Sequence, residues 1–193
     1  MTNFNDQITQ IFEQSVDSLN KSISLKTQIN DAINLIINSI KNGNKLIIFG
    51  NGGSAADAQH IAAELIGRFK LERKSLPAIA LTTDTSILTS LGNDYSYDTI
   101  FSRQCESLVL KNDVVIGIST SGNSKNVELG MKTALKKGAK TIGLLGHNGG
   151  IIKSVSDISI IVNSVDTANI QESHRVIYHI ICNLVESQLS EKL

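Results

Sequence analysis

Hydrophobic positions divide the chain into two parts with different spacing. Residues 1 to about 42 carry isoleucine, leucine and phenylalanine at intervals of three and four, which is typical of a pair of amphipathic helices. From Lys45 onward the pattern changes to short, continuous apolar runs, each followed by turn-forming residues and a longer segment with helical spacing. The runs cover residues 46–49, 78–81, 114–118, 141–145 and 158–162.

Continuous hydrophobicity in these runs predicts strands that are covered on both faces, as in a parallel sheet between layers of helices. The intervening helices are expected over residues 54–67, 97–110, 124–137 and 168–190. We therefore predict an α/β fold, a three-layer α-β-α sandwich with a five-stranded parallel sheet. The single domain, 1–193, would consist of an N-terminal helical extension, about 1–42, and a core, about 43–193. The apolar stripes of the extension either contact another subunit or pack on the core, and the sequence leaves both open.

Composition limits the classes of partner. Eighteen basic and eighteen acidic residues give zero formal charge, so no global positive field attracts nucleic acid or an anionic membrane. Cys105 and Cys182 lie far apart without a CxxC pair, which favours reduced thiols over a disulfide framework. The first twenty residues lack the apolar stretch of a secretory signal, and no segment reaches the roughly 18 apolar residues of a membrane span. We expect a cytoplasmic protein whose anion site, if any, is local.

The strongest local motif is Ser-Thr-Ser-Gly-Asn-Ser at residues 119–124, called the serine loop below. It follows a predicted strand and precedes a helix that begins near Lys125, at the end of a parallel sheet where ligands bind. Hydroxyls, a flexible glycine and the free N–H groups of a helix start can together bind a phosphate. An ordinary N-cap at Asn123 or Ser124 is the alternative, but it uses only one of the polar residues.

A glycine-rich loop, residues 50–54, ends the first predicted strand. Its glycines let the backbone approach a ligand closely, and Ser54 can cap the next helix. The spacing is not GxGxxG, so a dinucleotide is not indicated. A tight strand-to-helix turn explains this loop equally well on its own. Beside the serine loop, it suggests a small phosphorylated ligand that lies across adjacent strand ends.

Two helices carry candidate metal ligands or proton-transfer groups. His60 and Glu64 stand at i and i+4 after the glycine-rich loop, where they form either a reactive pair or a plain surface ion pair. In the last helix, Gln171 and His179 lie about 80° apart around the axis and share one side. His179 is expected to point inward, as a ligand or as a satisfied core histidine. His174 stands among charged neighbours and is expected to be exposed.

Two further segments are ambiguous. Asn93 and Asp94, at the end of a short predicted helix, can bond sugar hydroxyls or form a turn. Residues 147–150, His-Asn-Gly-Gly, are interpreted as a turn.

Together, the order and spacing of these motifs over nearly the whole chain resemble the sedoheptulose-7-phosphate isomerases, also called phosphoheptose isomerases, a family of sugar isomerase (SIS) domain proteins. The resemblance implies an α/β sandwich of the SIS type and a homotetramer with active sites between subunits. It implies one zinc ion per subunit. It also implies conversion of sedoheptulose 7-phosphate to D-glycero-D-manno-heptose 7-phosphate, the first step of ADP-heptose biosynthesis for lipopolysaccharide or related glycans.

The resemblance also assigns residues. Zinc would be held by His60, Glu64, Gln171 and His179. The substrate would be contacted at its phosphate by Ser119, Thr120, Ser121 and Ser124, and elsewhere by Asn51, Gly52, Gly53, Glu64, Asn93, Asp94 and Gln171. Glu64 and His179 would be the catalytic acid and base. A carboxylate that also binds zinc is a weaker base, because the cation favours its ionised form, so the division of the two roles stays open.

One departure and two rival functions follow from the same resemblance. The family often has an arginine where this chain has Asn169, which puts a charge contact at that position in doubt. A related SIS tetramer is non-enzymatic and binds the bacterial replication initiator, but it lacks the acid and the histidine at the positions of Glu64 and His179. A sugar-phosphate-sensing regulator would need a DNA-binding segment, and none accompanies the domain. These comparisons favour the enzyme, and leave the anomer, the destination glycan and the physiological metal open.

Overall fold

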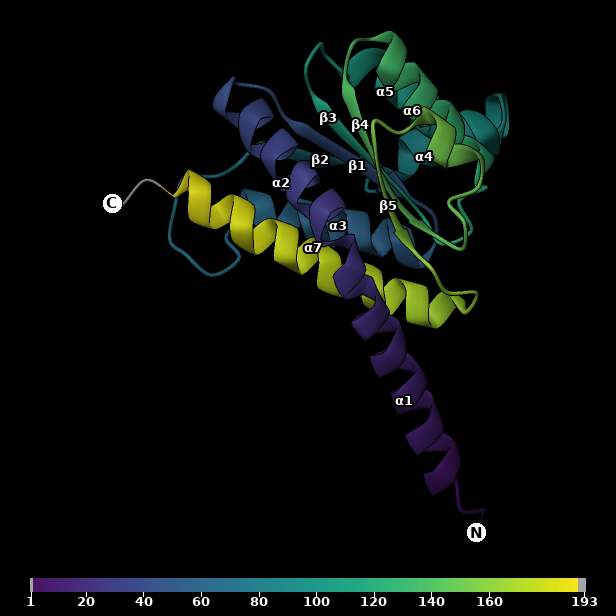
Figure 1. Ribbon diagram of the computed structural model, residues 1–193. Helices are drawn as coiled ribbons and strands as arrows, with labels where there is room; N and C mark the ends of the chain where they lie inside the picture. The colour runs from purple at the N-terminus through teal and green to yellow at the C-terminus, as the bar shows by residue number, and fades with distance from the viewer. Residues whose placement is uncertain (1, 191–193) are drawn as a thin grey trace.

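The sheet of the computed structural model, which describes residues 2–190, is parallel throughout and has five strands in the order β2-β1-β3-β4-β5 (Figure 1). This confirms the prediction of strand positions and direction. The strands are β1 (Leu46–Gly50), β2 (Ala78–Ala80), β3 (Val114–Ser119), β4 (Lys140–Gly146) and β5 (Ile158–Val162).

Helices cover both faces of the sheet, α2, α3 and α7 on one and α4, α5 and α6 on the other (Figure 1). This arrangement confirms the three-layer sandwich. The α-helices are α1 (Asn5–Ser22), α2 (Lys26–Lys41), α3 (Gly53–Ile66), α4 (Thr85–Asp94), α5 (Ile100–Leu108), α6 (Lys125–Lys136) and α7 (Thr167–Leu189). Three 3₁₀ turns are η1 (Ile23–Leu25), η2 (Tyr97–Thr99) and η3 (Ile151–Val155).

Each face of the sheet has its own hydrophobic core, because successive side chains of a strand point to opposite faces. On β1, Ile48 belongs to the core under α2, α3 and α7, whereas Phe49 belongs to the core under α5 and α6. Phe49 stacks on Phe101 of α5 with ring centroids 4.8 Å apart. The continuous apolar runs of the sequence are therefore explained by burial on both sides.

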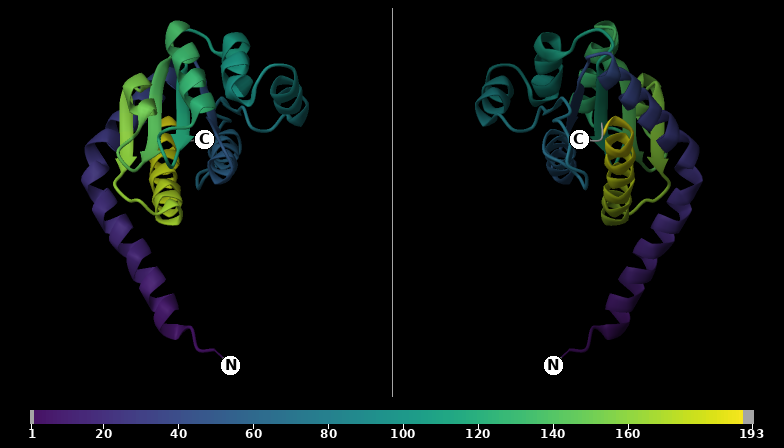
Figure 2. Two further views of the ribbon diagram at one scale, coloured as in Figure 1. Left: turned by 90° about the vertical axis from the view of Figure 1, so that its right-hand side faces the viewer. Right: turned by 90° about the vertical axis from the view of Figure 1, so that its left-hand side faces the viewer.

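The two N-terminal helices have different surroundings. The apolar stripe of α2 is buried in the core, so this helix is part of the sandwich. In contrast, α1 projects away from the sandwich (Figures 1 and 2), and its apolar side chains are exposed, including Ile11 at 61% and Phe12 at 68%. Near its end, Ser18 is buried against α7, with its Oγ 3.1 Å from Oγ of Ser173. Of the two alternatives for the N-terminal stripes, packing on the core therefore holds for α2. Within residues 2–190, no other element covers the apolar stripe of α1.

Both thiols, Cys105 and Cys182, are free and buried. Burial is the main cause that raises the pKa of each to about 12, so both stay protonated at neutral pH. They are therefore poor nucleophiles and poor metal ligands. Among the described residues, no helix is both long and apolar enough to cross a membrane.

Candidate active site

The serine loop connects the end of β3 to the start of α6. Ser119 is buried, and its Oγ lies 2.9 Å from Oγ of Ser124 and 3.5 Å from Oγ of Ser121. Ser124 is the N-cap residue of α6, yet its side chain makes no capping bond, and the side chain of Asn123 instead contacts Ser121 and Ile151. The capping alternative is thus absent from this helix start. Clustered hydroxyls beside uncapped N–H groups can bind a phosphate without a cationic side chain.

A close backbone contact fixes the shape of this loop. Gly122 has φ +68°, and a Cβ there would lie 2.3 Å from the backbone of Gly149 in the turn after β4. The backbone N–H of Ile152 donates to the Gly122 carbonyl at 3.0 Å. The predicted turn at residues 147–150 therefore supports the serine loop, and any side chain at position 122 would separate the two segments.

The glycine-rich loop lies between the serine loop and α7. A Cβ on Gly50 would lie 2.8 Å from the Ile118 carbonyl, and one on Gly53 would lie 2.5 Å from Nε2 of Gln171. The side-chain amides of Asn51 and Asn126 bond each other at 2.8 and 3.0 Å. Glycine is thus required here by close packing on both neighbours. Gly52, at φ 56°, is the N-cap residue of α3, and Ser54, which the sequence suggested as a cap, is already inside the helix.

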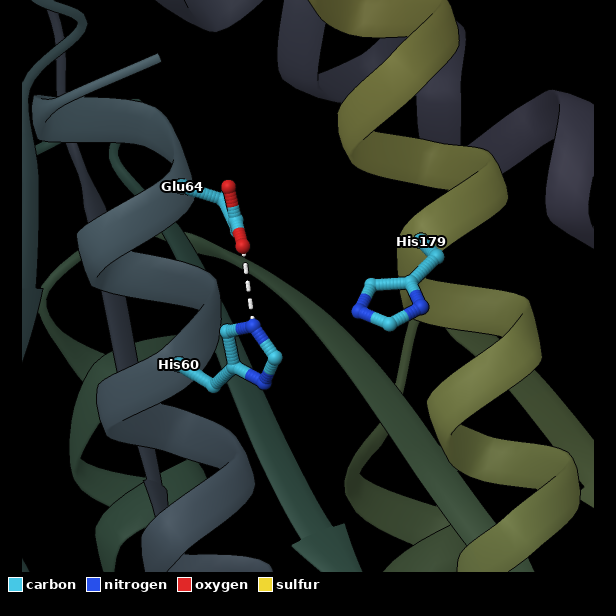
Figure 3. Close-up of side chains that lie close together, drawn as sticks. All are labelled: His60, Glu64 and His179. Carbon is cyan, nitrogen blue, oxygen red and sulfur yellow. Dashed lines mark hydrogen bonds and ion pairs between the residues drawn. The ribbon is translucent and has the colours of Figure 1, made fainter. Parts of the chain in front are cut away.

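A cluster of His60, Glu64 and His179 forms where α3 faces α7 (Figure 3). Nε2 of His60 lies 2.8 Å from Oε1 of Glu64, and the imidazole rings of His60 and His179 have centroids 5.2 Å apart. One ligand atom from each residue lies within 4.8 Å of the others. His60 and Glu64 were predicted to share a face of one helix, and the fold brings His179 to them.

A hydrogen-bonded chain supports the far side of the His60 ring. Nδ1 of His60 lies 2.9 Å from the Tyr178 hydroxyl, which donates to Asp57 at 3.3 Å. Arg175 donates to the same carboxylate oxygen of Asp57 at 3.1 Å. Burial, and then the charge of Asp57, raise the pKa of Tyr178 to about 12, so its hydroxyl keeps its proton. The contact with Tyr178 orients the His60 ring, so that its Nε2 faces Glu64.

His179 is half-buried between aromatic rings, those of Tyr178 and Phe69, at centroid distances of 4.7 and 5.5 Å. Burial, with the nearby His60 as a second cause, lowers the pKa of His179. The imidazole is therefore neutral at neutral pH, which is the form that binds a metal or accepts a proton. Its ring points toward His60 of α3, as the inward orientation expected from the sequence requires (Figure 3).

The other predicted site residues are placed differently. Gln171 lies on α7 with its amide against Gly53, at the boundary between the glycine-rich loop and the last helix. Asn93 and Asp94 are exposed at the end of α4, where their side chains bond each other at 2.8 Å. Over residues 2–190, neither has a hydrogen bond to the serine loop or to the His60 cluster. Thr120 is half-buried beside Ser119.

One expectation about the last helix is wrong. His174 was expected to be exposed, but it is completely buried, and its Nε2 bonds the Leu145 carbonyl of β4 at 3.0 Å. The charged neighbours were misleading, because Glu172 and Arg175 lie on other sides of the same helix. Asn169, where the family often has arginine, has its Oδ1 3.3 Å from Oγ of Ser15, so this position contacts α1.

Sequence reasoning missed the residues that support the cluster. Asp57 could have been found, since it lies at i−3 from His60 on the face that also carries Glu64. Glu186 could have been noticed as an acidic residue on the apolar stripe of α7. For Tyr178 and Phe69 no pattern distinguishes a role at the site from ordinary packing.

The donor atoms of the cluster suit zinc. Two imidazole nitrogens and a carboxylate oxygen make up a known catalytic zinc ligand set, with a further position left for water or substrate. Zinc–ligand bonds of about 2.1 Å place tetrahedral ligand atoms roughly 3.4 Å apart. The observed separations, all within 4.8 Å, require only small side-chain movements to reach that geometry.

Comparison with known proteins finds a matching family, similar sequences and similar solved structures. Residues 3–146 match the SIS domain family. The phosphoheptose isomerase of Citrifermentans bemidjiense is 60% identical over 168 residues, 87% of this chain and 88% of that protein. That of Aquifex aeolicus is 52% identical over 188 residues, 97% and 98% of the two chains. The solved structure of phosphoheptose isomerase GmhA from Neisseria gonorrhoeae superimposes with a TM-score of 0.91 at 39% identity, covering 96% of this chain and 100% of that one.

Proposed function

The chain belongs to the SIS-domain family of phosphoheptose isomerases, and from this premise we propose how its site works. The substrate is sedoheptulose 7-phosphate and the product D-glycero-D-manno-heptose 7-phosphate. The reaction moves a proton between carbons 1 and 2, as in other aldose–ketose isomerisations. It requires a base, an acid and stabilisation of the negative charge that develops on the substrate oxygens.

The observation that carries this proposal is the His60, Glu64 and His179 cluster, in a protein that also has an anion-binding loop at the strand ends. The serine loop binds the phosphate through Ser119, Thr120, Ser121 and Ser124. The glycine-rich loop, with Asn51, Gly52 and Gly53, lies along the sugar, and Asn93 and Asp94 contact its hydroxyls. The phosphate thereby fixes one end of the sugar, so that carbons 1 and 2 meet the cluster.

Glu64 and His179 transfer the proton. Burial lowers the pKa of His179, so its imidazole has a free lone pair at neutral pH, and this lone pair takes the proton when it is not bound to zinc. Glu64 is held by His60 and has its carboxylate directed into the same space. Zinc, one ion per subunit, would be held by His60, Glu64 and His179, and would supply a Lewis acid for the carbonyl oxygen at the remaining position. Gln171, the fourth ligand that the family resemblance implies, has its amide against Gly53, seven residues before His60 on α3.

The assembly we propose is a homotetramer in the cytoplasm, acting at the start of ADP-heptose biosynthesis. The exposed apolar stripe of α1 supports the subunit contacts, since a stripe of this kind is rarely left in water. A non-enzymatic adaptor that binds the replication initiator would have no use for a metal and proton-transfer cluster, which favours the enzyme.

Metal removal tests the proposal. Protein treated with a chelator and dialysed is expected to lose turnover of sedoheptulose 7-phosphate, and zinc added to one ion per subunit is expected to restore it. Metal content and turnover are measured on the same samples. Full turnover by the metal-free protein would refute the zinc proposal, and zinc-loaded protein without turnover would refute the substrate assignment.

A further inference from the structure

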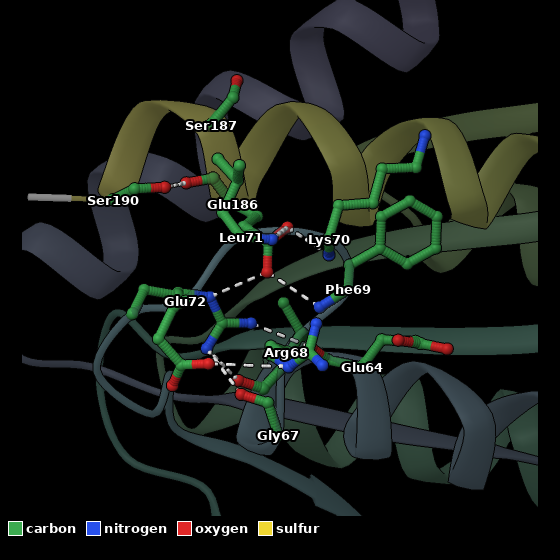
Figure 4. Close-up of polar contacts among 12 residues, drawn as sticks. Glu64, Gly67, Arg68, Phe69, Lys70, Leu71, Glu72, Glu186, Ser187 and Ser190 are labelled. Atoms are coloured by element: carbon green, nitrogen blue, oxygen red, sulfur yellow. Dashed lines mark hydrogen bonds and ion pairs between the residues drawn. The ribbon is translucent and has the colours of Figure 1, made fainter. Parts of the chain in front are cut away.

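The segment between α3 and β2 is anchored by one buried carboxylate. Three consecutive backbone N–H groups, of Phe69, Lys70 and Leu71, donate to the Glu186 carboxylate at 2.7, 2.7 and 2.9 Å (Figure 4). Glu186 is completely buried, near the end of α7. Burial alone would raise the pKa of its carboxyl, but the three N–H donors and the charge of Arg73 outweigh burial and lower it. Glu186 therefore acts as a charged acceptor that draws this segment onto α7.

Arg73 extends the same contact to the end of α3. Its Nε lies 3.2 Å from Oε1 of Glu186, and both side chains are almost fully buried. Its guanidinium donates to the backbone carbonyls of Leu65 at 2.8 Å, Gly67 at 3.1 Å and Glu64 at 2.8 Å. These carbonyls lie at the C-terminal end of α3, where they lack helical partners and carry partial negative charge. Arg73 thus binds α3 through one set of contacts and Glu186 of α7 through another.

Glu186 and Arg73 contact the same two helices that carry the His60, Glu64 and His179 cluster. Glu186 follows His179 by seven residues, so it lies on nearly the same face of α7, within about 20° and about 10.5 Å along the axis. On α3, Arg73 bonds the carbonyl of Glu64, a cluster residue. Phe69, whose N–H is bound by Glu186, has its ring 5.5 Å from that of His179. The contact therefore spans the same two helices as the cluster, about two turns of α7 away from it.

A buried ion pair is weak support for stability, because desolvation offsets most of its attraction. Metal ligands, on the other hand, must be held within about 0.5 Å of the required geometry. We propose that Glu186 and Arg73 are positioning residues that set the α3–α7 spacing and the place of Phe69, and so keep His179 in reach of His60 and Glu64. This inference rests on the proposed metal-dependent function. Apolar packing between α3 and α7 is the competing explanation.

Two substitutions test the inference through zinc affinity rather than activity alone. Glu186→Gln removes the charge and turns one acceptor into a donor that faces N–H groups. Arg73→Lys keeps the charge but loses the planar fork that reaches several carbonyls. Each is expected to raise the zinc dissociation constant about tenfold or more, the scale of outer-sphere substitutions. The constant is measured by competition with a chromophoric chelator, with turnover recorded in parallel.

Asp113→Asn is the matched control. Asp113 is a buried carboxylate immediately before β3, the central strand, and accepts from the N–H groups of Lys45 and Leu110 as well as from the Lys45 ammonium. Its loss is expected to lower thermal stability without changing zinc affinity. If Glu186→Gln and Arg73→Lys lower stability but bind zinc as tightly as the unmodified protein, packing sets the spacing and the inference is wrong. If the unmodified protein binds zinc but does not turn over substrate, the proposed function fails while the affinity comparison still decides the inference.

Hydrogen exchange of the unmodified protein provides a second test that does not depend on a variant folding. Coupling between two sites is reciprocal, so zinc is expected to slow exchange of the amides of Phe69, Lys70 and Leu71. The amides of Lys45 and Leu110, bound to Asp113, serve as the reference for global stabilisation. Equal slowing at both sets of amides, or none, would overturn the inference.

Discussion

The serine loop and the His60 cluster form the two halves of the same proposed site, but they are built in different ways. The serine loop consists of six consecutive residues between β3 and α6, and its hydroxyls meet through local turns. The cluster joins α3 to α7, segments from opposite halves of the sequence. A binding function that uses backbone N–H groups and neighbouring hydroxyls can be local. Proton transfer or metal binding by side chains requires two rigid elements at a fixed distance.

The largest expected effect separates chemistry from binding. Glu64→Gln and His179→Gln are each expected to lower kcat by about 10²- to 10⁴-fold, the usual contribution of a positioned acid or base. Both keep a polar side chain, so the fold and the proposed tetramer are expected to persist, as checked by circular dichroism and light scattering. Full activity in both variants would remove the cluster from the mechanism.

The stability of the protein in acid tests the contact between α7 and β4, the strand next to the one that leads into the serine loop. His174 bonds the carbonyl of Leu145, which pairs with Ser119 in the sheet. Burial is the main cause that lowers the pKa of His174 from 6.5 to about 4. Between these values the unfolded chain binds a proton and the folded chain does not, so stability is lost as the pH falls from 6.5 to 4. The expected loss is about 3 kcal/mol.

Urea unfolding at a series of pH values measures this loss. His174→Gln, which keeps a donor for the carbonyl without titrating, is expected to show a flatter dependence over the same range. Identical slopes for the variant and the unmodified protein would contradict the account of His174.

Ser124→Ala tests the loop without disturbing the cluster. Loss of one hydroxyl that bonds a charged phosphate costs about 2 kcal/mol, so KM for the sugar phosphate is expected to rise about 30-fold. The zinc dissociation constant is expected to stay the same, because the loop contains no cluster ligand. Ser187→Ala, on the exposed side of α7, is the control. A similar rise in KM for this control, or an unchanged KM for Ser124→Ala, would argue against a phosphate at the loop.

Tyr178→Phe affects the cluster without removing a ligand. It leaves Nδ1 of His60 without its partner while preserving the ring that packs beside His179. The zinc dissociation constant is expected to rise about tenfold, with KM for the sugar phosphate little changed. If KM rises and zinc affinity does not, Tyr178 contributes to substrate binding instead.

The strands and helices could be predicted because each has its own spacing of apolar residues over a short stretch of sequence. Residues 114–118, for example, are continuously apolar since β3 is covered on both faces. The error at His174 has a physical cause, because charged neighbours in sequence do not share its side of the helix. Asp57 was within reach as a residue on the face of His60 and Glu64, whereas Tyr178 looked like any other aromatic core residue.

The sequence by itself determined the strands and helices, the serine loop and the glycine-rich loop. Each of these depends on residues that are close together in the chain, through the spacing of apolar residues, the run of hydroxyls or the backbone freedom of glycine. From the residues alone, the sequence also placed His60 and Glu64 on one face of one helix. Only the tertiary structure brought His179 to that face, linked His60 to Asp57 through Tyr178, and set Glu186 and Arg73 beside them. The reason is that these contacts depend on how α3 and α7 pack on the sheet, which no local pattern specifies.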